Sequence, residues 1–218
     1  MGLDWNPANK AVPGREADYE ALKAALDAEL ADESQHDADD EQESEASRRF
    51  FEASISAFDT LMAPTVGVDE PANQWAREEF AQLETDEPFE KWFESIRGLR
   101  LAHLSPCPGV PRYSNGSVGG YVEPFSFRGQ FLTFCEPIIG MEVLERCYQN
   151  MPAEELISFG QHLKEKGEAL VRESGLILPK ESDEFDEEDP RWHADILIAA
   201  GDWCIFWGER GHPLEAYW

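Results

Sequence analysis

The stretch WHADILIAAGDWCIFW, residues 192–207, decides the fold class of this chain. Large apolar side chains recur in it every three or four residues, which is the spacing of one face of an α-helix. It contains the longest apolar run of the sequence, residues 194–207, but Asp195, Gly201 and Asp202 interrupt that run, and its length falls short of a membrane span. The pattern therefore predicts a buried helix of a globular domain, and Gly208 is expected to end it.

The same spacing recurs in six further segments, which predicts a chain built mainly of α-helices. Pro64, Gly98 and Gly175 are expected to end the second, fourth and sixth of these segments. The expected architecture is an irregular bundle of about seven helices in a single globular domain over residues 1–218. The six segments are residues 19–30, 50–62, 75–83, 89–96, 141–148 and 156–170.

The hydrophobic core is expected to come from the apolar faces of these helices. Hydrophobic residues make up 42% of the chain, which is enough for a compact domain of this length. The side chains predicted to be largely buried are Phe51, Ile55, Phe58, Trp92, Phe93, Phe159, Leu163, Trp203 and Phe206.

A Pro/Gly-rich central loop interrupts the helical pattern. Residues 105–124 carry four prolines and four glycines, a composition typical of loops. Leu99–His103 alternates like a short strand, and Gly120–Val122 is its candidate partner in a β-hairpin near 99–122. The phenylalanines of residues 125–135 fit either a strand or a helix, and the helix is favoured because Pro124 precedes it.

The charge of the chain limits the classes of partner. The sequence has 45 acidic and 18 basic residues, a formal net charge of −27, which argues against binding to nucleic acid or to an anionic membrane. Acidic residues are concentrated in segments 32–45 and 181–189. Because like charges repel, both segments are expected to be solvated and not packed.

The amino-terminal residues and the cysteines favour a cytoplasmic protein. Residues 1–7 show neither the basic nor the apolar run of a signal peptide. Cys107, Cys135, Cys147 and Cys204 are widely spaced, in a chain long enough to fold without disulfides. They are expected to be free and mostly buried thiols in a reducing compartment.

Between Arg97 and Cys135 the local charge reverses, because four arginines stand against Glu123 alone. A guanidinium group can donate two parallel hydrogen bonds to a carboxylate or phosphate, and glycines let backbone N–H groups turn toward an anion. Chance clustering of the arginines is the competing interpretation. The candidate ligand-binding residues are Arg97, Arg100, Arg112, Ser114, Asn115, Tyr121 and Arg128.

The sequence carries none of the short motifs that mark common enzymes and metal sites. The phosphate-binding P-loop, the dinucleotide fingerprint and the G-x-S-x-G elbow of hydrolases are absent, as are C-x-x-C and H-E-x-x-H. No cofactor, metal site or catalytic residue is therefore predicted, and whether the chain is an enzyme stays open.

Three functional hypotheses follow from these patterns. The favoured one is a binding or interaction protein that engages a basic protein partner through its negative surface. The alternative is a small-molecule enzyme or ligand binder that recognises a small anionic ligand at residues 97–135. In the third, the excess of acid and the low lysine content are an adaptation to salt. The oligomeric state is not predicted.

Overall fold

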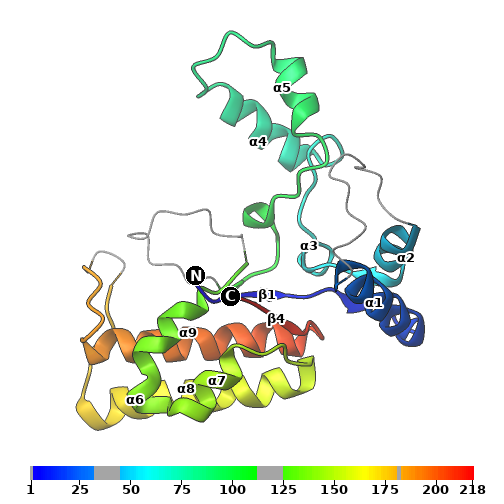
Figure 1. The fold of residues 1–218 in the computed structure, drawn as a ribbon. Coiled ribbons are helices and arrows are strands. Elements are labelled where there is room, and N and C mark those ends of the chain that lie inside the picture. The colour runs from blue at the N-terminus through cyan, green and yellow to red at the C-terminus, as the bar shows by residue number, and fades with distance from the viewer. Residues whose placement is uncertain (1, 32–44, 112–124, 181–182) are drawn as a thin grey trace. The chain divides into compact units, whose positions relative to one another are not determined.

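A computed structural model describes residues 2–31, 45–111, 125–180 and 183–218, and helices dominate it (Figure 1). The predicted mainly α class is confirmed. No helix within the described ranges is both long and apolar enough to cross a membrane. The elements are β1 (Asp4–Pro7), β2 (Lys10–Ala11), α1 (Glu16–Ala31), α2 (Glu45–Ala53), β3 (Ser54–Ile55), α3 (Ala57–Thr60), α4 (Glu70–Phe80), α5 (Phe89–Ser95), the 3-10 helices η2 (Ala102–Leu104) and η3 (Gly129–Cys135), α6 (Glu136–Ile139), α7 (Met141–Cys147), α8 (Ala153–Ser174), α9 (Pro190–Glu209) and β4 (Leu214–Tyr217).

The chain forms two compact units. The larger unit comprises Met1–Ala8 and Phe58–Trp218, and the smaller unit, Asn9–Ala57, is inserted between these two parts in the sequence. In the smaller unit β2 pairs antiparallel with β3, and the buried ring of Tyr19 on α1 stacks on a phenylalanine of α2. The single domain expected over residues 1–218 stays a prediction.

The second predicted helix, residues 50–62, is broken in the structure. The helix α2 ends at Ala53, and the next two residues form β3 before α3 begins. Ile55 is β-branched and stands between two serines, residue types that favour extended or locally hydrogen-bonded backbone over helix. Pairing with β2 then fixes the extended conformation. Phe51, predicted to be buried, lies within α2 and is 56% exposed.

An antiparallel pair of helices, α8 and α9, forms the main body of the larger unit (Figure 1). A Cβ atom on Gly160 would lie 2.8 Å from the carbonyl oxygen of Gly201, and one on Gly201 would lie 2.6 Å from the carbonyl oxygen of Gly160. No real side chain tolerates such distances, so glycine is required where the two backbones touch. The helical spacing of apolar residues did not predict this contact.

The end of α9 differs from the prediction. Gly208 was expected to stop the helix, but it lies within α9, buried where a Cβ would be 2.9 Å from the carbonyl oxygen of Ala153. The helix continues to Glu209, and Gly211 then adopts a φ of 75°, a left-handed conformation that glycine allows. Gly208 therefore serves helix packing. The expected stops at Gly98 and Gly175 do follow helices, with φ values of 88° and 62°.

The core of the larger unit forms where the helix pair meets β1. Trp5 is fully buried, and its Nε1 donates a hydrogen bond to the carbonyl oxygen of Cys147 at 2.8 Å. Its ring packs against Phe127 and Trp203, with ring centroids 5.1 and 5.7 Å apart. The Nε1 of Trp203 donates to the carbonyl oxygen of Phe125 at 2.8 Å. Aromatic side chains far apart in the sequence thus close one core.

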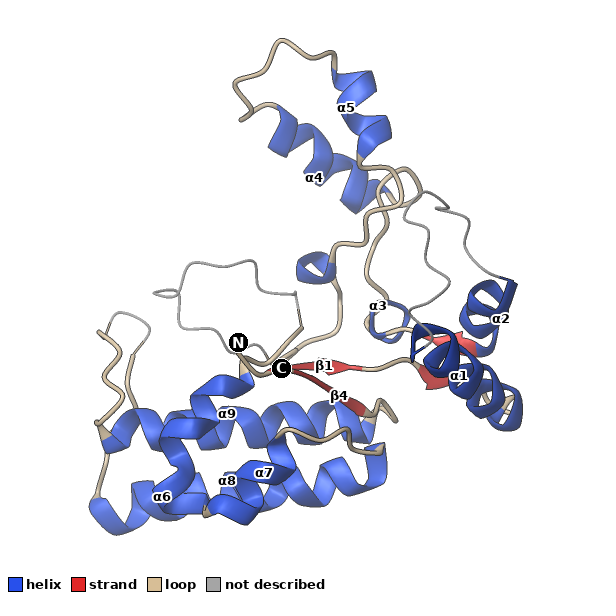
Figure 2. Cartoon of the chain, viewed as in Figure 1, coloured by secondary structure: helices blue, strands red, loops and turns tan. Residues whose placement is uncertain are grey.

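The two ends of the described chain meet in a small sheet (Figure 2). Strands β1 and β4 are antiparallel, with Asp4 opposite Tyr217 and Pro7 opposite Leu214. Single bridges extend the pair on both sides, to Phe127 beside β1 and to Met151 beside β4. The sheet therefore ties the chain ends to the segments that flank the helices.

The predicted core is correct in part. A second cluster, around the buried side chains of Val66, Ala72, Ala76 and Leu101, is partly covered by Trp92 and Phe93 of α5. Of the nine residues predicted to be largely buried, Leu163, Trp203 and Phe206 are buried, Ile55, Phe58, Trp92, Phe93 and Phe159 are half-buried, and Phe51 is exposed.

The hairpin expected near 99–122 stays a prediction, because its proposed partner strand, residues 120–122, lies outside the described residues. In the first segment, Arg100 is opposite Thr65 in an isolated bridge, and Val66 donates its N–H to the carbonyl oxygen of Leu99 at 2.9 Å. The 3-10 helix η2 then begins at Ala102. In residues 125–135, Phe127 is extended beside Trp5, and the favoured helix begins only at η3.

Candidate functional site

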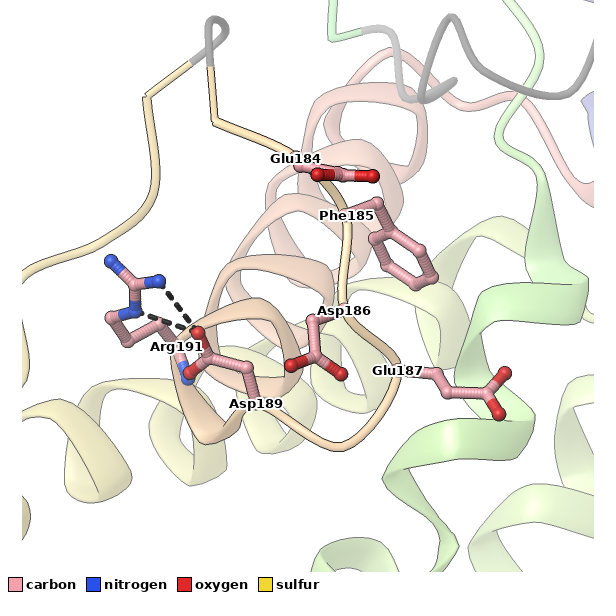
Figure 3. A pocket seen from close by; sticks show the side chains of 6 residues that line it. All are labelled: Glu184, Phe185, Asp186, Glu187, Asp189 and Arg191. Atoms are coloured by element: carbon pink, nitrogen blue, oxygen red, sulfur yellow. Dashed lines mark hydrogen bonds and ion pairs between the residues drawn. The ribbon is translucent and has the colours of Figure 1, made fainter.

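An open pocket of about 540 Å³ lies in the acidic loop that leads into α9 (Figure 3). We call it the acidic pocket, and it is formed by residues of one short segment, 184–191. Its lining residues are Glu184, Phe185, Asp186, Glu187, Asp189 and Arg191.

The loop around the pocket is held in place by one aromatic side chain and two backbone contacts. The half-buried ring of Phe185 packs against Phe131 and Trp192, with centroids 5.5 and 5.3 Å away. Trp192 Nε1 donates a hydrogen bond to the carbonyl oxygen of Glu184 at 3.2 Å. The carbonyl oxygen of Glu187 accepts one from Nε2 of His193, on α9, at 2.7 Å. The loop that carries these acidic side chains is therefore fixed against η3 and α9.

The acidic composition of segment 181–189 predicted a solvated loop and gave no indication of this anchoring. Its exposed carboxylates agree with that expectation, but Phe185 does not. Phe185 is the sole aromatic residue among the acids of that segment. A lone aromatic residue in an acidic run was the available signal, because it can anchor the run to a core.

Asp189 begins α9 and is neutralised within the loop. Its Oδ1 accepts the backbone N–H of Arg191 at 2.8 Å, the hydrogen bond of a helix N-cap. Its Oδ2 lies 2.6 Å from Nη2 of the same arginine. Hydrogen bonds from the Arg191 side chain and then from its backbone hold the pKa of Asp189 below its ordinary value. Asp189 is thus an ionised structural residue.

The other acids of the pocket are not held in a close ion pair of this kind with any described basic side chain. Glu184, Asp186 and Glu187 are exposed, and no ion pair with a described basic side chain includes them. The Asp186 carboxylate accepts the backbone N–H of Glu188 at 3.0 Å. Carboxylates around an aromatic ring can accept hydrogen bonds from a cationic group while the ring contacts its apolar stem. The described residues contain no cluster of three or more ligands suited to a metal ion.

The anion site predicted at residues 97–135 stays a prediction. Arg112, Ser114, Asn115 and Tyr121 lie outside the described residues. The three arginines that are described each lie beside a carboxylate, and those carboxylates belong to three different elements. The pairs are Arg97 with Glu94 of α5 at 3.1 Å, Arg100 with Asp59 of α3 at 2.6 Å, and Arg128 with Asp4 of β1 at 3.3 Å, the last without hydrogen-bond geometry.

The cysteines do not form a second candidate site. All four are free, and Cys135, Cys147 and Cys204 are buried. Burial raises the pKa of Cys135 and Cys147 to about 12, and that of Cys204 well above its ordinary value. A thiol that stays protonated is a poor nucleophile. Cys107 is partly exposed.

No protein-family model, no curated protein and no solved structure matches this chain.

Proposed function

We propose that this chain is a binding protein that engages a basic segment of a protein partner, and that the acidic pocket receives a lysine or arginine side chain of that segment. The observation that carries the proposal is the set of exposed carboxylates around Phe185, which form no ion pair with a basic side chain among the described residues. Because the loop is anchored before a partner arrives, binding would not require it to be ordered at the cost of entropy.

The charge balance of the fold supports the same function. At least ten acidic side chains take part in ion pairs between described residues. The sequence has 45 acidic and 18 basic residues, so its basic side chains are too few to pair with all of its acids. A surplus of this size creates a negative field that accelerates the encounter with a cationic partner.

The experiment compares two variants that carry the same net charge. In the pocket variant Glu184→Gln is combined with Glu187→Gln, and in the control Glu165→Gln is combined with Glu173→Gln on α8, where both glutamates are exposed. A fluorescent peptide of alternating lysine and glycine is titrated with each protein, and its anisotropy gives the affinity. The pocket variant is expected to bind about fivefold more weakly than the control, the loss expected for two exposed charge pairs.

The same titration at higher salt checks the electrostatic basis. Affinity should fall steeply up to about 0.3 M salt, since the screening length shortens over that range. If both variants lose the same affinity, the acidic pocket is not the docking place and only the general negative field acts. If the wild-type protein does not bind the peptide at low salt, the proposed function is wrong.

A further inference from the structure

His212 is fully buried in the turn between α9 and β4 and uses both of its ring nitrogens. Nδ1 lies 2.8 Å from the carbonyl oxygen of Ala8, and Nε2 lies 2.6 Å from Oγ1 of Thr60. A carbonyl oxygen can only accept a hydrogen bond, so Nδ1 carries the proton and donates it. In the neutral ring Nε2 then accepts from the Thr60 hydroxyl. A single neutral tautomer therefore makes both contacts.

These partners mark the two points where the inserted unit joins the larger one. Ala8 is the last residue before the inserted unit Asn9–Ala57, and Thr60 ends α3, through which the chain returns. The same segment makes a second hydrogen bond with Ala8, because the carbonyl oxygen of Pro213 accepts the backbone N–H of Ala8 at 2.8 Å. Ala8, Thr60 and His212 all belong to the larger unit, so the contacts are internal to it.

The position of the ring is fixed from the side of α9. The backbone N–H of His212 donates to the carbonyl oxygen of Trp207 at 3.0 Å. The rings of these two residues meet edge to face, with centroids 5.3 Å apart. The imidazole is thus held against α9, and from that position it hydrogen-bonds Ala8 before the inserted unit and Thr60 after it.

We propose that His212 is a clasp, a conformational device that holds together the two ends of the inserted unit. Loss of the two His212 side-chain hydrogen bonds would increase local opening of the backbone at Ala8 and after α3, while α8 and α9 stay paired. This inference rests on the geometry of His212 and is independent of the proposed partner.

The test is hydrogen exchange measured by mass spectrometry on the whole chain. His212→Phe keeps a ring of similar size and removes both hydrogen bonds, and Thr60→Val removes only the one to α3, with Thr60→Ser as the control that keeps the hydroxyl. His212→Phe should raise exchange about five- to tenfold at the amides of Ala8 and Ala63, which bond Pro213 and Phe58. Thr60→Val should raise it at Ala63 alone, and Thr60→Ser at neither.

Two results would overturn the clasp. One is unchanged exchange at Ala8 and Ala63 in a folded His212→Phe protein. The other is an equal rise along α8 and α9, which would show that His212 contributes only to global stability. If His212→Phe does not fold, the comparison of Thr60→Val with Thr60→Ser decides the question, and equal exchange at Ala63 in these two variants rejects the proposal.

Discussion

Burial separates the four cysteines into two classes. Cys135, Cys147 and Cys204 are in the core, where the loss of hydration disfavours the thiolate and raises the pKa of each thiol. Cys107 lies in a loop between two prolines and is partly exposed. The expectation of free, mostly buried thiols is confirmed, and chemical reactivity should follow exposure.

We expect one thiol per folded chain to react rapidly with iodoacetamide near pH 8. The alkylated residue should be Cys107, because the buried thiols stay protonated and covered until the protein unfolds. Mass spectrometry of the intact chain and of its peptides gives the number and position of the labels. Cys107→Ser should abolish the rapid reaction, and rapid labelling of Cys204 in folded protein would contradict the burial described.

The two ends of α9 show how a helix is bounded by different means. At its start, Asp189 caps the backbone and pairs with Arg191. At its end, the chain turns at Gly211 after Gly208 has been used for contact with α8. A glycine after an apolar run therefore has two meanings, a stop or a place of close packing, and the run alone does not distinguish them.

Asp189→Ala should lower the free energy of unfolding by about 1 kcal/mol, the usual cost of losing an N-cap side chain. Because the folded-state pKa of Asp189 is lowered, the stabilisation is fully present above the unfolded pKa of about 4. It is lost as the pH falls through the lower folded value. Urea unfolding at pH 7 and at a series of lower pH values that extends well below pH 3 measures both effects.

Controls for this prediction come from the same loop. Asp189→Asn keeps an oxygen that can cap the helix but loses the charge, so its effect should be smaller than that of alanine at pH 7. Glu188→Ala removes an exposed acid next to the cap and should change stability little. A loss with Asp189→Ala that is equally large at pH 7 and well below pH 3 would contradict the linkage.

The whole molecule carries a charge of −27, because 45 acidic residues stand against 18 basic ones. Such a surface repels itself, and the compact state concentrates that repulsion. Mobile ions screen it over about 10 Å at 0.1 M salt. Salt dependence therefore distinguishes simple self-repulsion from an adaptation to concentrated salt.

We expect the melting temperature to rise by about 3–6 °C between low salt and about 0.3 M sodium chloride, corresponding to about 1–2 kcal/mol for a chain of this length. The gain should then level off, because screening is nearly complete. Calorimetry across the salt series measures this, with the double variant at Glu184 and Glu187 expected to gain less. A melting temperature that keeps rising into molar salt would favour the adaptation hypothesis.

Periodicity and helix-ending residues were sufficient to predict the helical class and most of the helices. Apolar spacing located α1, α4, α5, α7, α8 and α9, because a helix that buries one face must repeat its apolar residues every three to four positions. The acidic character of the loop before α9 was equally plain from composition. These features are local, because each depends only on residues that are consecutive in the sequence.

Contacts between distant residues decided the remainder. Ile55 became part of a strand because β2 offered it a partner, and Trp5 became central because Phe127 and Trp203 enclose it. In the acidic pocket, the charges were visible in the sequence, but the anchoring of Phe185 on η3 and α9 was not. The physical reason is that pairing and packing energies depend on which segments meet, and the spacing within one segment does not specify its neighbour.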